Sequence, residues 1–230
     1  MNDLHQGPFD VVPWPDTLTA RVVTPGARPH LHGYDCETDL ATLPSGDRIL
    51  LALTGELPPR ARAKAFDVVT SFLAPVAVNE APTHAAVLAR LCSGSTSSIL
   101  STGALALAEQ ARTVVAGLSP HWSWLARPES DTPIDLRAAD DEERASVDRL
   151  RDALRASGLP VPALERDLGR VPAVVATLLA CGLTEPHQVE AVWVVARLPV
   201  VLAEAMAERP GNLREYPWHL PRFHYEEADR

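Results

Sequence analysis

Aromatic side chains are scarce in this sequence, at 5% of its 230 residues, whereas alanine and leucine are abundant. Strands draw on aromatic and β-branched residues, so this composition favours helices. Cysteine is also rare, because only Cys36, Cys92 and Cys181 are present and they lie far apart. An odd number at such spacing argues against a disulfide framework and against a CxxC metal site. The apolar surroundings of Cys92 and Cys181 predict that both thiols are buried.

Basic residues are outnumbered, 21 against 30 acidic ones, which gives a formal net charge of -9. Because nucleic-acid affinity comes mostly from neutralised phosphates, we expect no nucleic-acid partner, although a local basic pocket for a carboxylate or a nucleotide is compatible with this charge. No apolar run approaches the roughly 20 residues that a bilayer-spanning helix needs. No apolar N-terminal stretch follows a basic start either. We therefore expect a soluble, cytoplasmic protein without a membrane partner.

Apolar periodicity and helix-breaking residues predict an all-α protein with irregular ends. The proline-rich residues 1–30 predict an extended arm or short irregular strands. Helices are predicted at 47–54, 60–74, 83–91, 99–117, 138–157, 172–181 and 186–208. The helix at 99–117 is apolar nearly all round as far as Ala108, so we expect it at the centre of the fold. Pro199 is expected to kink the last helix.

The order of several short phrases is the most specific feature of the sequence. They are LHGYD at 31–35, LLALTGELPPRARAKAFDVVTSFLAP at 50–75, NEAPTHAAVLARL at 79–91, STGALALAEQA at 101–111 and VVARLPVVLAEAM at 194–206. This order resembles the citrate synthase and citryl-CoA lyase family, and the chain length is closest to its short citryl-CoA lyase-like members.

The resemblance implies a fold and an assembly. The fold would be an all-α, citrate synthase-like one, with residues 1–118 and 183–230 forming a large helical domain. Residues 119–182 would form a smaller inserted helical domain. The resemblance also implies a homodimer, which would bury the apolar helix at 99–117.

In that family, one half of the active site holds a keto-dicarboxylate through a carbonyl-polarising histidine and several arginines. The segment PHWSWL to DLRA at 120–138 resembles the corresponding family segment. The resemblance implies that His121 polarises the carbonyl and that Arg137 binds a carboxylate. Arg197 matches a further carboxylate-binding arginine, and Arg214 or Arg209 matches the arginine that reaches across the dimer.

The other half of the family's site enolises the methyl group of an acyl-CoA thioester, with an aspartate as base and a histidine that stabilises the enol. This half has no intact counterpart. Gln110 or Ala104 falls at the histidine position, depending on the alignment, and neither can become a cationic donor. The aspartate position falls near Val171, and Asp167, about one turn earlier, is the nearest substitute.

These replacements predict a citrate synthase-like protein with a degenerate active site that binds a carboxylate, keto-acid or acyl-CoA ligand. If it is active, it would be an acyltransferase or C–C lyase with divergent chemistry. The alternative is a non-catalytic paralogue that binds a metabolite or partners another subunit. No cofactor is expected, although a CoA thioester would be a substrate. No metal is expected either, because His30 and His32 lack a carboxylate or cysteine partner.

The candidate residues also have ordinary structural explanations. Arg197 lies in a strongly apolar helix, where a charge must be paired, so it either binds an anion or forms an internal ion pair. Arg137 precedes an acidic run and can pair with it. Glu80 can act as a replacement acid or base, or it can hydrogen-bond a neighbouring helix terminus. His121 can be a surface residue of a loop.

Overall fold

The computed structural model describes residues 17–211 and 222–224. The chain divides into two compact units, an N-terminal unit (Met1–Leu57) and a helical unit (Pro58–Arg230). Helices dominate the described residues, and the strands are short segments of two residues each, which confirms the all-α prediction. Within the described residues, no helix is both long enough and apolar enough to cross a membrane.

The N-terminal unit holds a small antiparallel sheet and one helix. Its strands, in sheet order, are β1 (Val23–Thr24), β2 (His30–Leu31) and β3 (Tyr34–Asp35), and the helix is α1 (Ser45–Thr54). His32 and Gly33 join β2 to β3, and both have positive φ, as a tight two-residue hairpin turn requires. The expectation of short irregular strands is therefore confirmed for the described part of the N-terminal segment.

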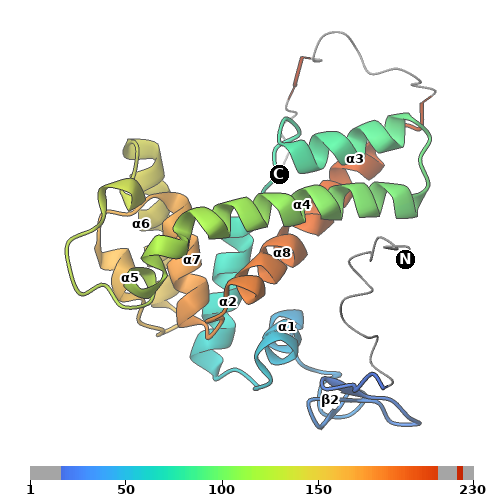
Figure 1. Cartoon of the computed structure of the whole chain (residues 1–230), viewed down its shortest axis with the longest axis horizontal. Helices are drawn as coiled ribbons and strands as arrows, with labels where there is room; N and C mark the ends of the chain where they lie inside the picture. Colours follow the sequence, from blue (N-terminus) through green and yellow to red (C-terminus); the bar gives the residue numbers. More distant parts are fainter. Residues whose placement is uncertain (1–16, 212–221, 225–230) are drawn as a thin grey trace, which may run out of the picture. The chain divides into compact units, whose positions relative to one another are not determined.

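The helical unit consists of helices joined by short turns (Figure 1). Its elements are α2 (Arg60–Leu73), α3 (Ala81–Leu91), α4 (Thr96–Leu118), η1 (Ser119–His121), α5 (Trp122–Ala126), η2 (Ile134–Leu136), α6 (Asp141–Arg155), η3 (Pro162–Glu165), α7 (Arg170–Ala180) and α8 (Pro186–Ala207). These bounds confirm the predicted helices to within a few residues at each end.

Capping side chains lie at the two helix starts that differ most from the predicted ones, those of α4 and α6. The Ser95 hydroxyl accepts a hydrogen bond from the backbone N–H of Ser98, so α4 begins inside the predicted serine-rich turn. The Asp140 carboxylate accepts from the N–H of Glu143, so α6 begins after the acidic run has started. Helix α8 continues through Pro199 to its end at Ala207.

The prediction for the cysteines was half right. Cys181 is buried, and this burial raises the pKa of its thiol to about 12. Cys92, however, is exposed, and the prediction of a buried thiol was wrong for it. The residue is the C-cap of α3, so an apolar neighbourhood in sequence did not translate into burial.

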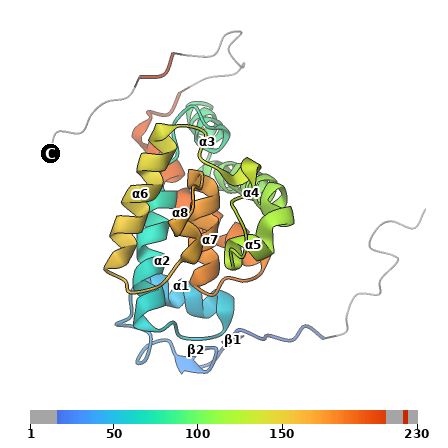
Figure 2. The same cartoon turned by 90° about the vertical axis from the view of Figure 1, so that its left-hand side faces the viewer.

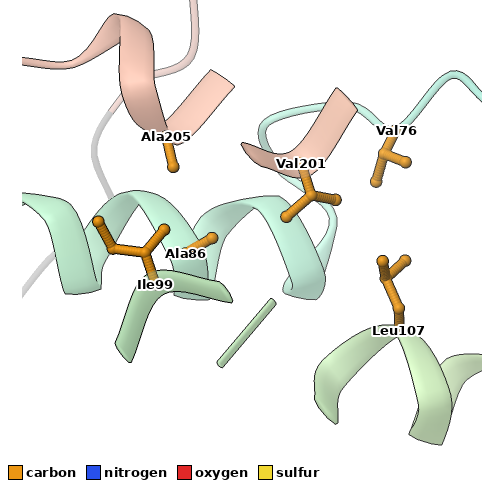
Figure 3. Close-up of a cluster of buried hydrophobic side chains, with 6 residues drawn as sticks. All are labelled: Val76, Ala86, Ile99, Leu107, Val201 and Ala205. Atoms are coloured by element: carbon orange, nitrogen blue, oxygen red, sulfur yellow. The ribbon is translucent and has the colours of Figure 1, made fainter. Parts of the chain in front are cut away.

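Helices α3, α4 and α8 pack together around a small apolar cluster (Figure 3). The cluster consists of Val76, Ala86, Ile99, Leu107, Val201 and Ala205. Helix α4 contributes Ile99 and Leu107, which lie on its buried face together with Gly103. On its other face Leu105 is 66% exposed. The expectation of a central helix therefore holds for one face of α4 only.

Helix α7 is the most enclosed helix of this unit. All residues from 173 to 179 are buried, and α7 packs against α2 and α6 (Figure 2). Because α6 and α7 belong to residues 119–182, the predicted inserted segment packs closely on α2. The predicted division into a large and an inserted domain stays a prediction.

The close crossing of α3, α4 and α8 yields a stability prediction. A Cβ atom on Gly103 would lie 2.9 Å from the Val201 Cγ1 atom, which is closer than side chains approach. We expect Gly103→Ala to destabilise the protein by about 1–3 kcal/mol, because the three helices must move apart. Denaturant unfolding monitored by circular dichroism measures this change.

Gly117 provides the matched control, since it lies in the same helix and a Cβ atom there would meet no described atom within 4 Å. Gly117→Ala should be neutral or stabilise the protein by up to about 1 kcal/mol, because alanine is the better helix former. Equal effects of the two substitutions would contradict the described packing.

Candidate functional site

One cavity of the helical unit brings together three polar residues to which the sequence pointed: Glu80, Gln110 and Arg197. It has a volume of about 280 Å³. Its lining comes from the end of α2 and the following turn, from the start of α3 and from α4, α7 and α8. The lining residues are Phe72, Leu73, Pro75, Glu80, Gln110, Val114, Arg170, Val171, Val174, Trp193 and Arg197.

The carboxylate of Glu80 is the shared acceptor of this cavity. Its Oε2 atom accepts from Arg197 Nη2 at 2.7 Å and from Gln110 Nε2 at 3.0 Å. Its Oε1 atom accepts from the backbone N–H of Ala77 at 2.9 Å. Glu80 is the N-cap residue of α3, and its own N–H donates to Ala77 O, so the turn before α3 sets the position of the carboxylate.

Arg197 is buried in the middle of α8, with only 8% of its side chain exposed. Besides Glu80, it donates through Nη2 to the carbonyl of Pro75 at 3.2 Å. Its guanidinium carbon lies 5.2 Å from the centre of the Trp193 ring, a cation–π contact. Its Nε atom is buried and has no hydrogen-bond partner among the described residues.

Gln110 is held in one orientation by two partners. Its Nε2 donates to Glu80, and its Oε1 accepts from the Trp193 indole N–H at 3.2 Å. Both ends of the amide are therefore engaged. A neutral amide fixed in this way can orient a ligand, but it can neither take up nor release a proton near neutral pH.

Burial and neighbouring charges act in opposite directions on Arg197. Removal from water lowers the pKa of its guanidinium, and the nearby Glu80 carboxylate opposes this by raising it. Arg170, the second arginine of the cavity, adds a further lowering through like-charge repulsion. The cavity thus holds two guanidinium groups against one carboxylate.

The structure brings Gln110 and Arg197 together but not the other candidates. His121 does not line this cavity, and its Nε2 atom lies 2.6 Å from Asp135 Oδ2 instead. Asp167 also lies outside it, in an exposed pair with Arg144 at 3.4 Å. The proposed roles of His121 and Asp167 stay predictions.

Of the two remaining arginines, only Arg137 lies within the described residues. Arg137 donates from Nε to the carbonyl of Thr132 at 3.2 Å, so its described partner is neither a ligand nor the acidic run at the start of α6. Arg137 does not line the cavity. Arg214 lies outside the described residues. The carboxylate-binding roles of Arg137 and Arg214 stay predictions.

For Arg197 and Glu80, the sequence had left open whether the explanation is structural or functional. The internal ion pair is the observed arrangement for Arg197. Glu80 binds the N–H of Ala77, which lies in the turn before α3. The sequence did not predict that Arg170 and Trp193 would line this cavity. The only signal for Arg170 was a basic residue at the first position of a helix, where the helix dipole disfavours positive charge.

Among the residues that the structure describes, no three histidine, cysteine or acidic side chains gather in a way that could hold a metal ion. The polar groups of the cavity are its two arginines, its carboxylate and the neutral side chains of Gln110 and Trp193. This set can bind and orient an acid, and it contains no proton acceptor that is free of other hydrogen bonds.

The shared role of Glu80 leads to a stability prediction. Glu80→Ala should destabilise the protein by about 3 kcal/mol, because it leaves the buried Arg197 guanidinium without a counter-charge. This is the low end of the range for buried pairs, since 33% of the Glu80 side chain is exposed. Equilibrium unfolding in urea measures the effect.

Glu109→Ala is the matched control, because the pair of Glu109 with Arg112 has a similar distance, 2.6 Å, but 59% and 67% exposed side chains. Its removal should change stability by no more than about 0.5 kcal/mol. A Glu80→Ala effect as small as that of the control would show that the buried pair has little influence on folding.

No protein-family model matches the sequence, and no curated protein does so either. Solved structures do match in fold. The citryl-CoA lyase from Hydrogenobacter thermophilus superposes with a TM-score of 0.66 at 16% identity, and the match covers 90% of this chain and 97% of that one.

Two structures of larger enzymes also match. They are the ATP citrate lyase from Methanothrix soehngenii in complex with citrate and coenzyme A, with a TM-score of 0.58, and the D541A mutant of the Methanosaeta concilii ATP citrate lyase in complex with (3S)-citryl-CoA, with a TM-score of 0.60. Both are 13% identical, and each match covers 92% of this chain and 43% of the enzyme. The chain therefore has a citrate synthase-like, citryl-CoA lyase-like fold.

Proposed function

We propose that this chain is a citrate synthase-like protein with a degenerate active site, which binds a small carboxylate or keto acid, or the acyl end of an acyl-CoA, in the cavity around Arg197. The observation that carries this proposal is the engagement of Glu80. It is the only carboxylate that lines the described cavity, and it accepts hydrogen bonds from Arg197, Gln110 and Ala77.

This engagement argues against proton abstraction from carbon. A general base needs a free lone pair near the reacting carbon and a pKa suited to the task. Gln110 and Trp193 are not bases, and guanidinium groups are hydrogen-bond donors without an acceptor atom. The loss of a general base alone lowers a rate by about 10²–10⁴-fold. C–C bond formation or cleavage in this cavity would therefore depend on a base other than the engaged Glu80 carboxylate.

Binding of an acid is supported by the residues that remain. Arg197 is desolvated, which strengthens its attraction to an anion, and Gln110 and Trp193 add fixed polar groups. The similar ATP citrate lyases hold citrate, coenzyme A or (3S)-citryl-CoA in their structures. The cavity's volume of about 280 Å³ lies just below the range of sites for drug-sized ligands, which suits a small acid.

A second candidate function is that of a non-catalytic subunit that pairs with another chain, including a second copy of this one. Leu100 and Leu105 favour it, because they are 40% and 66% exposed on α4. Contiguous exposed apolar patches are typical of surfaces that a partner covers, and these two leucines would form part of such a patch. This function does not compete with ligand binding in the cavity, since none of these leucines lines it.

Ligand binding can be measured by isothermal titration calorimetry with citrate and with oxaloacetate. We expect both to bind, and we expect Arg197→Met to weaken the binding at least about tenfold, because a charge-assisted hydrogen bond is lost. Arg112→Met, which removes an exposed arginine of α4 outside the cavity, should leave the dissociation constants unchanged. Circular dichroism verifies that both variants are folded.

The same preparation should release no thiol above the buffer rate from acetyl-CoA plus oxaloacetate, or from citryl-CoA. Release that depends on the protein and is lost in Gln110→Ala would refute the degenerate site. Absence of binding by every tested acid would refute the ligand-binding part of the proposal and leave the partner-subunit function.

A further inference from the structure

We infer that Arg170 forms, together with Arg197, a subsite for one oxyanion group, so that the ligand of this cavity carries a carboxylate or a phosphate between the two guanidinium groups. This inference rests on the proposed ligand-binding function and makes it more specific. Arg170 was not singled out by the sequence.

The charges of the cavity are unbalanced. Arg170 and Arg197 face a single carboxylate, that of Glu80, so the lining carries one net positive charge. Repulsion by the positive charge of Arg170 lowers the pKa of the Arg197 guanidinium. One bound negative charge would balance the lining and remove this repulsion.

Both arginines also have unused hydrogen-bond donors. Arg170 donates from Nη2 to the carbonyl of Phe72 at 2.8 Å, and it forms no ion pair with a carboxylate of the described residues. Arg197 uses only Nη2, towards Glu80 and Pro75, while its buried Nε atom has no described partner. A buried donor without a partner is unfavourable, and an oxyanion would satisfy it. Guanidinium groups match carboxylate and phosphate oxygens equally well.

The start of α7 adds a smaller contribution. Arg170 is the first residue of α7, no side chain caps this end, and its first turn holds no acidic residue. Backbone N–H groups at such an end favour an anion. The Glu143 Oε2 atom lies near Gly169, the N-cap residue of α7, and accepts from the N–H of Ala139. The helix end therefore assists the two arginines and does not form the subsite by itself.

Arg170 also has a structural role, because its hydrogen bond to Phe72 O joins α7 to the end of α2. The two roles predict different results. A structural role alone would lower stability on substitution and leave ligand affinity unchanged. An anion subsite would lower the affinity for charged ligands selectively.

The test uses calorimetric titration of the full chain with four probes: oxaloacetate, pyruvate, inorganic phosphate and the uncharged methyl pyruvate. The variants are Arg170→Gln, Arg170→Lys and the control Arg166→Gln, which removes an exposed arginine that precedes α7 and does not line the cavity. Urea unfolding of each variant reports stability separately.

We expect Arg170→Gln to weaken the binding of anionic probes about tenfold or more, because charge-assisted hydrogen bonds are lost. Arg170→Lys should weaken this binding less than Arg170→Gln does, because lysine keeps the positive charge but lacks the paired N–H groups of a guanidinium. Arg166→Gln should match the wild type within about twofold, and the affinity for methyl pyruvate should not depend on Arg170.

Unchanged affinity of Arg170→Gln for oxaloacetate and pyruvate, with binding still dependent on Arg197, would overturn this inference and leave the proposed function intact. Binding of phosphate but of neither acid would support the subsite and contradict the carboxylate function. If the wild type binds none of the charged probes, both are wrong.

Discussion

The carboxylate of Glu80 accepts hydrogen bonds from three separate parts of the helical unit: from Arg197 on α8, from Gln110 on α4 and from Ala77 in the turn before α3. The other features of the cavity depend on this shared acceptor. It compensates the charge of a buried arginine, and it fixes the amide whose other end holds the Trp193 indole. Without it, the guanidinium would be desolvated and unpaired.

The same arrangement determines what chemistry the cavity can support. Both oxygens of the carboxylate accept hydrogen bonds, and the buried Nε atom of Arg197 beside it has no partner among the described residues. The proposed function, binding of an acid rather than removal of a proton from carbon, rests on this arrangement. The citryl-CoA lyase-like fold supplies a scaffold in which such a pocket lies between helices, and its polar residues come from segments far apart in the sequence.

Much of the fold followed from the sequence, because apolar periodicity and breaker residues act locally. The largest differences in helix starts lie where a side chain caps the helix, at Ser95 and Asp140. Burial was less predictable: α4 looked central, yet α7 is the more enclosed helix, because neighbours and not hydropathy decide which face is covered. Cys92 was misjudged for the same reason.

The site was predictable in part. The resemblance to the citrate synthase family pointed to Gln110 and Arg197, which do meet in one cavity, but composition and spacing alone would not have joined residues so far apart. Arg170 has no pattern in the sequence that marks it, since only the tertiary structure places it in the same cavity as Arg197. The side chains of His121 and Asp167 are of types that often act in catalysis. In the structure, the described partner of His121 is Asp135, and that of Asp167 is Arg144.

The most direct test of the central role of Glu80 is a double-mutant cycle that combines Glu80→Ala with Arg197→Met, with free energies of unfolding measured in urea. If the carboxylate and the guanidinium stabilise each other in the buried cavity, the double mutant should be less destabilised than the sum of the two single mutants by at least about 1.5 kcal/mol. Effects that add to within about 0.3 kcal/mol would show that the two groups do not interact, and would contradict the central role of this carboxylate.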